Sequence, residues 1–269
     1  MNRIDARFAA LREQQRTGLI TFLTAGDPDP ALTPVAMAAL VEHGADLIEL
    51  GMPFSDPMAD GPVIQQANER ALAKGVGLKH VLGALRQFRA GDTATPVVLM
   101  GYLNPIERYG TNQFIADAAA AGADGLLLVD CPIEESAGYR PLLDAHDLKQ
   151  IHLIAPTTPA QRRLRIAAQA SGFIYYVSFK GITGAGHLEQ DSALKAIAEI
   201  KSETSVPLAV GFGIKDATSA KALGEHADAI VIGSALIERM APCGDSAALT
   251  AAIGGFLGPI RQALSRATD

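Results

Sequence analysis

Short runs of hydrophobic residues recur along the whole chain, and each is followed by an alanine-rich segment with helical spacing. The runs are apolar at nearly every position, which is typical of parallel strands that crossover helices bury on both faces. We therefore expect eight strands, at 19–24, 46–50, 97–101, 125–129, 151–155, 173–177, 208–210 and 229–232.

A three-residue repeat marks the joint between a helix and the next strand. It reads GAD at 44–46 and 122–124, and HAD at 226–228. The glycines suit the left-handed position that follows a helix end, and the aspartates then open the strands. In a strand–helix barrel the strand starts form the face opposite the chemistry, so we expect these aspartates to be structural.

Eight strands that alternate with helices predict an α/β fold, a (β/α)8 TIM barrel. No long polar or Pro/Gly linker divides the chain, so we expect a single domain over 1–269 with an extra N-terminal helix. The segment after the second strand holds more than one crossover helix needs. It predicts an inserted loop at 56–62 followed by helices at 63–73 and 78–89. An open, doubly wound sheet is the alternative that strand number alone leaves open.

Composition narrows the class of protein. The chain has 269 residues, 48% of them hydrophobic, which favours a compact fold with a sizeable core. The net charge of −6 argues against a nucleic-acid partner or an anionic membrane surface. The charged N-terminus resembles no signal peptide, and no apolar run is long enough to span a membrane. Two cysteines and six histidines without ligand spacing predict a reducing compartment, the cytoplasm, and no metal site.

Glu49 is the first candidate for chemistry, because it interrupts an apolar strand near its carboxyl end. The two-residue period of a strand places Leu47 and Glu49 on one face and Ile48 and Leu50 on the other. An unpaired carboxylate there costs several kcal/mol, roughly, and no basic partner lies nearby in sequence. Glu49 is thus either a salt-bridged or solvent-reaching strand end, or an acid/base group whose pKa burial raises.

The loop that follows, at 53–62, contains three prolines and two aspartates and is stiff enough to position side chains. Asp56 suits an Asp-Pro turn, and Asp60 suits the cap of the helix that begins near Pro62. Spacing alone leaves these structural roles and a catalytic role equally open.

Glycine-rich turns follow the last three expected strands, at 181–186, 211–213 and 233–234. Glycines let backbone N–H groups turn toward an anion, and the loops after the last strands of this barrel commonly bind phosphate. Three such turns predict a phosphate pocket. Thr183 in the first turn suits either a lid or an ordinary loop, and Tyr175 either the site or the core. Lys180 is the one lysine suited to an imine, although we expect it to be solvated.

These motifs together resemble the family of tryptophan synthase alpha subunits. The resemblance runs through GLITFLTAGDP at 18–28, IELGMPFSDPMADGP at 48–62, MGYLNP at 100–105, DCPIEE at 130–135 and the three glycine turns. It covers nearly the whole chain and leaves mainly the C-terminal helix unmatched.

The resemblance implies a carbon–carbon lyase that cleaves indole-3-glycerol phosphate to indole and glyceraldehyde 3-phosphate. It assigns catalysis to Glu49 and Asp60, with Tyr175 beside the reacting hydroxyl. It implies substrate contacts from Phe22, Thr183, Gly184, Phe212, Gly213, Gly233 and Ser234. The loops at 56–60 and 179–187 are expected to close over the substrate. No cofactor is expected in this chain, whereas a beta subunit carrying pyridoxal phosphate is implied as the partner that receives the indole.

Three other functions remain open beside that one. The chain is either a subunit or a stand-alone lyase that releases free indole, since both share every motif. A regulatory subunit that only binds a phosphate ester is disfavoured, because Glu49, Asp60 and the glycine turns are all retained. An aldolase that forms an imine on Lys180 is the fourth alternative.

Overall fold

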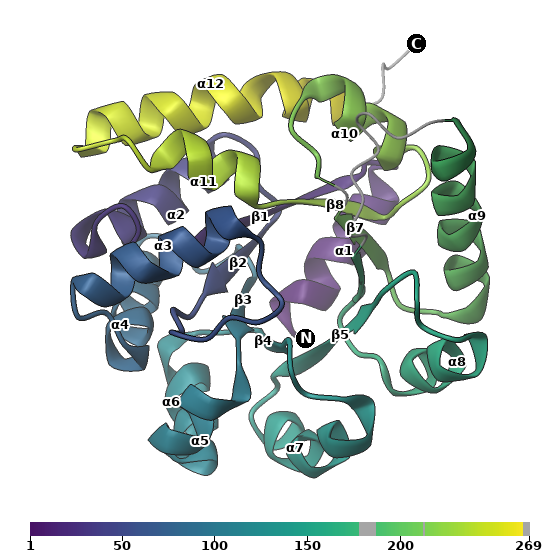
Figure 1. Ribbon diagram of the computed structural model, residues 1–269, viewed down its shortest axis with the longest axis horizontal. Coiled ribbons are helices and arrows are strands. Elements are labelled where there is room, and N and C mark those ends of the chain that lie inside the picture. Colours follow the sequence, from purple (N-terminus) through teal and green to yellow (C-terminus); the bar gives the residue numbers. More distant parts are fainter. Residues whose placement is uncertain (178–186, 212, 266–269) are drawn as a thin grey trace.

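Eight parallel strands form a closed barrel in the computed structural model, which describes residues 1–177, 187–211 and 213–265, without the side chains of 187–192 (Figure 1). Each strand pairs with its sequence neighbours, and β1 closes the barrel against β8. The strands are β1 Gly18–Thr24, β2 Leu47–Gly51, β3 Val97–Gly101, β4 Gly125–Leu128, β5 Lys149–Ile154, β6 Ile174–Val177, β7 Leu208–Gly211 and β8 Ala229–Ile232. The predicted TIM barrel is confirmed, and the open sheet is excluded.

The helices surround the strands as an outer ring, except for the first, α1, which lies across one end of the barrel (Figure 1). They are α1 Arg3–Glu13, η1 Pro30–Leu32, α2 Thr33–Glu42, α3 Pro62–Ala73, α4 Leu78–Arg89, α5 Leu103–Tyr109, α6 Thr111–Ala121, α7 Ile133–Ala145, α8 Ala160–Gln169, α9 His187–Glu203, α10 Ala217–Gly224, α11 Ser234–Met240 and α12 Ser246–Leu264. Both expected helices after β2 are present as α3 and α4. The short helix α5, directly after β3, was not predicted.

Strand edges differ from the sequence prediction by one or two residues. β2 begins at Leu47 rather than at 46, and the side chain of Asp46 accepts the backbone N–H of Leu19 at the joint. β5 begins at Lys149, two residues earlier than expected, since its first pairs with β4 run through Lys149 and Gln150. Polar residues at a strand start carry no hydrophobic signal, so periodicity missed them.

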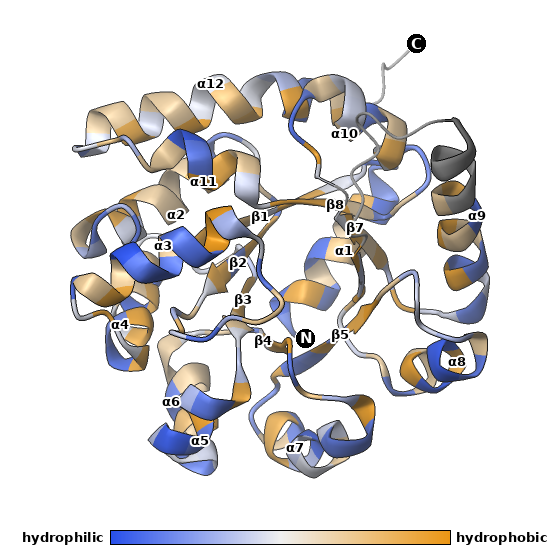
Figure 2. Cartoon of the chain, viewed as in Figure 1, coloured by the Kyte–Doolittle hydropathy of each residue, from blue (hydrophilic) through white to orange (hydrophobic). Residues whose placement is uncertain are grey.

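Two layers of apolar side chains come from the two faces of the strands. Leu47 and Val98 belong to the cluster inside the barrel, whereas Ile48 and Leu50 pack outward against the helices. The helices turn hydrophobic faces toward the strands and polar faces outward (Figure 2). The predicted alternation of β2 is therefore confirmed, and it points position 49 into the barrel.

Helix α1 packs against the end of the barrel where the strands begin. Ile4, Phe8 and Leu11 are buried and belong to the same cluster as the interior side chains of the barrel. The ring of Phe8 lies 5.7 Å from that of Phe173, just before β6. The extra N-terminal helix thus covers one end of the barrel core, and the site must be sought at the other end.

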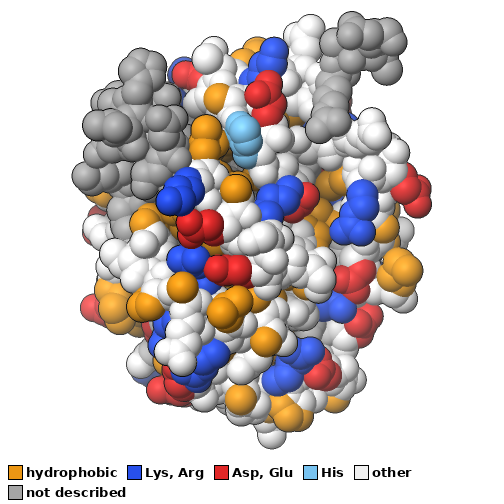
Figure 3. Space-filling model, turned by 90° about the vertical axis from the view of Figure 1, so that its right-hand side faces the viewer, with side chains coloured by type: hydrophobic (Ala, Val, Ile, Leu, Met, Phe, Trp, Pro, Cys, Tyr) orange, Lys and Arg blue, Asp and Glu red, His pale blue; other side chains and the backbone are white. Residues whose placement is uncertain are grey.

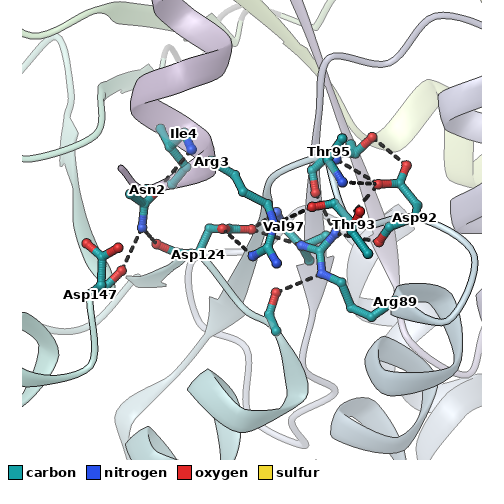
Figure 4. A network of polar contacts seen from close by, with 12 residues as sticks. Asn2, Arg3, Ile4, Arg89, Asp92, Thr93, Thr95, Val97, Asp124 and Asp147 are labelled. Atoms are coloured by element: carbon teal, nitrogen blue, oxygen red, sulfur yellow. Dashed lines mark hydrogen bonds and ion pairs between the residues drawn. The ribbon is translucent and has the colours of Figure 1, made fainter.

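The aspartates of the repeated joint have the structural role predicted for them. Asp124 accepts hydrogen bonds from Arg3 and Arg89 and from the backbone N–H of Val97, which opens the neighbouring strand (Figure 4). Asp46 binds the N–H of Leu19 in the same way. Each aspartate therefore ties the start of its own strand to the start of the strand before it.

Two physical reasons explain why glycine occupies the joint at positions 44 and 122. Gly44 and Gly122 have φ of +98° and +94°, which side chains rarely adopt. A Cβ at Gly122 would lie 2.8 Å from the stem of Arg89, and one at Gly44 would lie 2.7 Å from Arg261. Those arginines cross the glycines to reach Asp124 and Asp46. The joint is thus a unit in which a bare backbone lets a basic side chain reach the aspartate.

Charges on one side of the molecule alternate in sign (Figure 3). The arginines of α8 illustrate this, because Arg162 binds Glu134 and Arg163 binds Glu199 and Glu203. The pair between Arg162 and Glu134 is exposed, and exposed pairs contribute little to the free energy of unfolding. Among the described residues, no helix is long and apolar enough to cross a membrane.

Candidate active site

A cavity of about 580 Å³ opens at the carboxyl ends of the strands. It collects predicted site residues that are far apart in the sequence, namely Phe22, Glu49, Asp60, Tyr175, Gly213, Gly233 and Ser234. This is the end of the barrel at which enzymes of this fold bind their substrates. Thr183, Gly184 and Phe212, the remaining predicted contacts, lie outside the described residues, as do Lys180 and most of the loop at 179–187.

Glu49 is the most deeply buried acidic group of the cavity. Its exposed fraction is 1%, and neither carboxyl oxygen has a hydrogen-bond partner among the described residues. Burial without a compensating partner raises the pKa of Glu49 to about 8. The solvent-reaching alternative is therefore wrong, and Glu49 forms no salt bridge with any described residue; at neutral pH the group is mostly a protonated acid facing the cavity.

Two features of the sequence place Glu49 there. Phe22 lies opposite Glu49 in the register of β1 and β2, so both side chains point inward at one level. Gly51 leaves room for the ring of Phe22, because a Cβ at position 51 would lie 2.7 Å from that ring. An aromatic wall and a carboxyl group consequently share one side of the cavity.

Asp60 approaches the cavity from the loop after β2. The loop turns tightly, with the N–H of Asp60 donating to the carbonyl of Pro57 at 3.0 Å. Helix α3 begins after Gly61, which is its N-cap residue, so Asp60 does not cap the helix. Asn68 of α3 instead donates to the carboxyl of Asp60 at 3.4 Å.

The environment of Asp60 differs from that of Glu49. Desolvation raises the pKa of Asp60 to about 6, and hydrogen bonds from Tyr102 and Asn68 oppose that rise. At neutral pH Asp60 is mostly ionised, whereas Glu49 is mostly protonated. Two carboxyl groups in one cavity with separated pKa values are a recurrent arrangement for acid/base chemistry.

Tyr175 extends from β6 into the same cavity. Burial raises its pKa well above the ordinary value, with a further contribution from the charge of Glu49. A Cβ at Gly211 would clash with the Tyr175 hydroxyl, so the glycine of β7 permits this position. The neighbouring Tyr176 belongs to the outer cluster between strands and helices. Of the two tyrosines, Tyr175 alone lines the cavity among the described residues.

The two described glycine turns line the same cavity. Gly213, with φ of +57°, follows β7, and Gly233 and Ser234 connect β8 to α11. The backbone N–H groups in the first turn of a helix have no intrahelical acceptor and are available to an anion. The predicted convergence is therefore confirmed for the second and third turns.

Comparison with known proteins gives this site a family. The model of the family "Tryptophan synthase alpha chain" matches residues 8–252. The alpha chain of Burkholderia multivorans is 53% identical over 269 residues, covering 100% of this chain and 99% of the relative. The alpha chain of Methylibium petroleiphilum is 51% identical, with 100% and 98% covered. The chain belongs to the tryptophan synthase alpha chain family.

Solved structures agree with that assignment. The crystal structure of tryptophan synthase subunit alpha from Legionella pneumophila superposes with a TM-score of 0.91 at 44% identity, covering 98% of each chain. A Mycobacterium tuberculosis tryptophan synthase structure gives 0.88 at 32% identity, again with 98% of each chain covered. The resemblance inferred from the motifs is thus confirmed, and the chain is a carbon–carbon lyase with the reaction of this family.

Several residues of the cavity were not predicted as site residues. Met100, Val129 and Leu153 form an apolar wall from β3, the residue after β4, and β5. Their side chains face the barrel interior as Glu49 does, but in the sequence an apolar residue in a strand cannot be told from an ordinary core residue. Lys215 and Glu238 also line the cavity, and nothing in their sequence surroundings distinguishes them from surface residues. Among the described residues no cluster of His, Cys, Asp or Glu is arranged to hold a metal ion.

Proposed function

We propose that Glu49 and Asp60 carry out the cleavage of indole-3-glycerol phosphate in this alpha chain, with Glu49 as the proton shuttle. The observation that carries the proposal is the pair of carboxyl groups in one cavity, one mostly protonated and one mostly ionised at neutral pH. The apolar wall beside them suits an indole ring, and the glycine turns suit a phosphate.

Glu49 serves both proton transfers of the reaction. Breaking the bond between indole C3 and the glycerol chain requires one proton at C3 and the loss of one from the glycerol hydroxyl that becomes the aldehyde. A carboxyl group with a pKa near 8 supplies the first proton at neutral pH and, once ionised, accepts the second. General acid/base catalysis of this type contributes about 10²- to 10⁴-fold. Tyr175 lines the same cavity, and in this proposal it is a neighbour of the reacting hydroxyl.

Asp60 stabilises the charge that the first proton transfer creates. Protonation of C3 leaves positive charge on the indole ring, and the ring N–H is where an ionised carboxylate accepts a hydrogen bond. The pKa of Asp60, near 6, keeps it mostly ionised at pH 7. The roles of the two acids thus follow from their different surroundings.

The remaining substrate contacts extend from this centre to the glycine turns. Phe22 forms a wall of the indole pocket, and the backbone amides of Gly213, Gly233 and Ser234 hold the phosphate. Gly184, Thr183 and Phe212 are assigned to the same substrate on the family motif alone. The whole chain, residues 1–269, acts as one barrel domain in this proposal.

The partner we propose is a beta subunit that carries pyridoxal phosphate and takes up the indole, in an alpha–beta heterotetramer. The alpha chain itself uses no cofactor for the steps above. The two cysteines, Cys131 and Cys243, are free, which fits a cytoplasmic protein.

The test is to incubate the purified chain with indole-3-glycerol phosphate and to follow indole, with and without a beta subunit. Indole release that rises when the beta subunit is added supports the proposal. Release that the beta subunit leaves unchanged identifies a stand-alone lyase. Binding of the substrate without any indole indicates a regulatory subunit, and covalent trapping by borohydride in the presence of substrate indicates an imine on Lys180.

A further inference from the structure

Asp60 lies between side chains from two parts of the chain, helix α3 and the residue that follows β3. The second of these, Tyr102, has no role in the proposed chemistry. Tyr102 follows β3 directly, at the N-cap of α5. Because β2 and β3 are adjacent, with Gly51 opposite Met100, the loop after β2 passes beside Tyr102. The inference rests on the proposed role of Asp60 and extends it to this neighbour.

The hydroxyl of Tyr102 lies against the loop at Ala59, next to Asp60. It accepts a hydrogen bond from the backbone N–H of Ala59 at 3.2 Å, and as a hydrogen-bond donor beside Asp60 it lowers the pKa of that carboxyl group. A phenol has one hydrogen to donate. When its oxygen accepts from Ala59, that hydrogen is free to point at the Asp60 carboxylate.

Tyr102 is itself held rigidly. Its exposed fraction is 3%, and its ring centre lies 5.3 Å from that of Phe54, which belongs to the loop after β2. The following backbone N–H, of Leu103, donates to Asp130 at 2.9 Å. Tyr102 is not among the residues that line the cavity, so it does not touch the substrate pocket directly.

Helix α3 holds Asp60 from the other side. Asn68, which is 5% exposed, donates to the carboxyl group at 3.4 Å. Gln65 donates to the backbone carbonyl of Asp60 at 2.7 Å. The carboxyl group therefore has a donor from α3, and the Tyr102 hydroxyl at the end of β3 lies beside it on the loop.

We propose that Tyr102 is a positioning residue for Asp60: its hydroxyl bridges the Ala59 amide and the Asp60 carboxylate and so keeps that carboxylate aimed at the indole N–H. The phenyl ring alone would fill the same space without making either hydrogen bond. Asp60 would then be free to rotate away from the cavity. A misplacement of about 1 Å at a reacting centre can cost about 100-fold in rate.

The deciding variant is Tyr102→Phe, because it keeps the ring and removes only the hydroxyl. Tyr109→Phe is the matched control, since the Tyr109 hydroxyl also binds an aspartate, Asp117 at 2.7 Å, but outside the cavity. We expect Tyr102→Phe to lower kcat about 10- to 100-fold with KM within about threefold. Tyr109→Phe should leave both constants unchanged, and both variants should keep the Tm of the parent within a few degrees.

A pH profile separates positioning from a general loss of structure. The hydrogen bond from Tyr102 lowers the pKa of Asp60, so its removal should shift the acidic limb of kcat/KM to higher pH. Among the described residues, the other charged groups that line the cavity are Glu49, Lys215 and Glu238, and Asp130 lies beside Tyr102. The variant changes none of these groups, so the basic limb should stay in place.

A double-mutant cycle with Asp60→Asn shows whether Tyr102 acts through Asp60. If it does, adding Tyr102→Phe to Asp60→Asn lowers kcat by less than threefold further. Full additivity of the two losses, or a Tyr102→Phe enzyme with parental kcat and acidic limb, would overturn the positioning role. If Asp60→Asn alone keeps parental activity, it is the proposed role of Asp60 that fails, and the two failures are thereby distinguished.

Discussion

Phe22 and Glu49 lie opposite each other in the register of β1 and β2, with both side chains turned into the barrel. The aromatic ring is thus an immediate neighbour of a carboxyl group that has no hydrogen-bond partner among the described residues. Burial away from water explains why Glu49 holds its proton at neutral pH, and Phe22 belongs to the apolar lining of the same cavity.

The first prediction concerns the pH dependence of the cleavage rate. Asp60 must be ionised and Glu49 protonated, and their pKa values are about 6 and about 8. Activity should therefore rise as pH increases through about 6 and fall as it increases through about 8, giving a bell-shaped profile of kcat/KM. The profile of the isolated alpha chain measures this directly. A rate that keeps rising to pH 10 would contradict the assignment of Glu49 as the acid.

The second prediction concerns the free energy of unfolding. The pKa of Glu49 is raised from about 4.5 to about 8 by folding, so between these values the unfolded chain loses a proton that the folded chain keeps. Stability conferred by the protonated group is complete below pH 4.5 and is lost as pH rises toward 8. The variant Glu49→Gln has no such proton and should lack this loss.

Urea denaturation at pH 6 and pH 9 tests this relation. Between the two pH values, the parent should lose about 2–3 kcal/mol relative to Glu49→Gln. The comparison cancels the constant cost of burying an amide in place of a carboxyl group. Parallel stability curves for the two proteins over this range would show that Glu49 is not buried as described.

The third prediction concerns the phosphate end of the cavity. Gly213→Ala places a side chain in the left-handed region at a turn that is proposed to aim its amide at the phosphate. We expect KM for indole-3-glycerol phosphate to rise at least about tenfold, with little change in the affinity for indole, which has no phosphate. Gly75→Ala is the control, because Gly75 has φ of +74° and open space around it. Equal kinetic effects of the two variants would contradict the phosphate assignment.

The fourth prediction concerns the opposite end of the barrel. Asp124 is buried and binds Arg3 and Arg89, and Arg89 is itself only 10% exposed. Asp124→Asn leaves that arginine with only its longer pair, to Asp92 at 3.9 Å, and should cost about 3–5 kcal/mol of stability. Asp144→Asn, which breaks an exposed pair with Arg140, should cost at most about 1 kcal/mol. Chemical denaturation of both variants measures these losses. Equal losses would contradict the role of Asp124 in tying the starts of β3 and β4 together.

The sequence predicted the barrel well because its signal lies in local patterns. Apolar runs recur at each strand, and alternation in β2 placed Leu47 and Glu49 on the inner face. The alternation of side chains along a strand does not predict how deeply a given side chain is buried. Whether Glu49 meets a basic partner depends on side chains from other strands, and only the assembled barrel shows that it meets Phe22 instead.

Asp60 shows the same limit more strongly. Its sequence neighbours permit a helix cap or a turn, and spacing alone does not decide between these and catalysis. Its partners, Asn68 and Tyr102, come from α3 and from the end of β3. Likewise, the repeat at 122–124 predicted where Asp124 lies. Its partner Arg89 comes from α4, and no local sequence pattern predicts that pair.

The central claim is that Glu49 transfers the protons of the cleavage, and the most direct measurement compares the parent with Glu49→Gln at pH 7. Indole release from indole-3-glycerol phosphate should fall more than about 100-fold in the variant. A non-cleavable substrate analogue should still bind with an affinity within about fivefold of the parent. A variant that releases indole within tenfold of the parental rate would contradict the account.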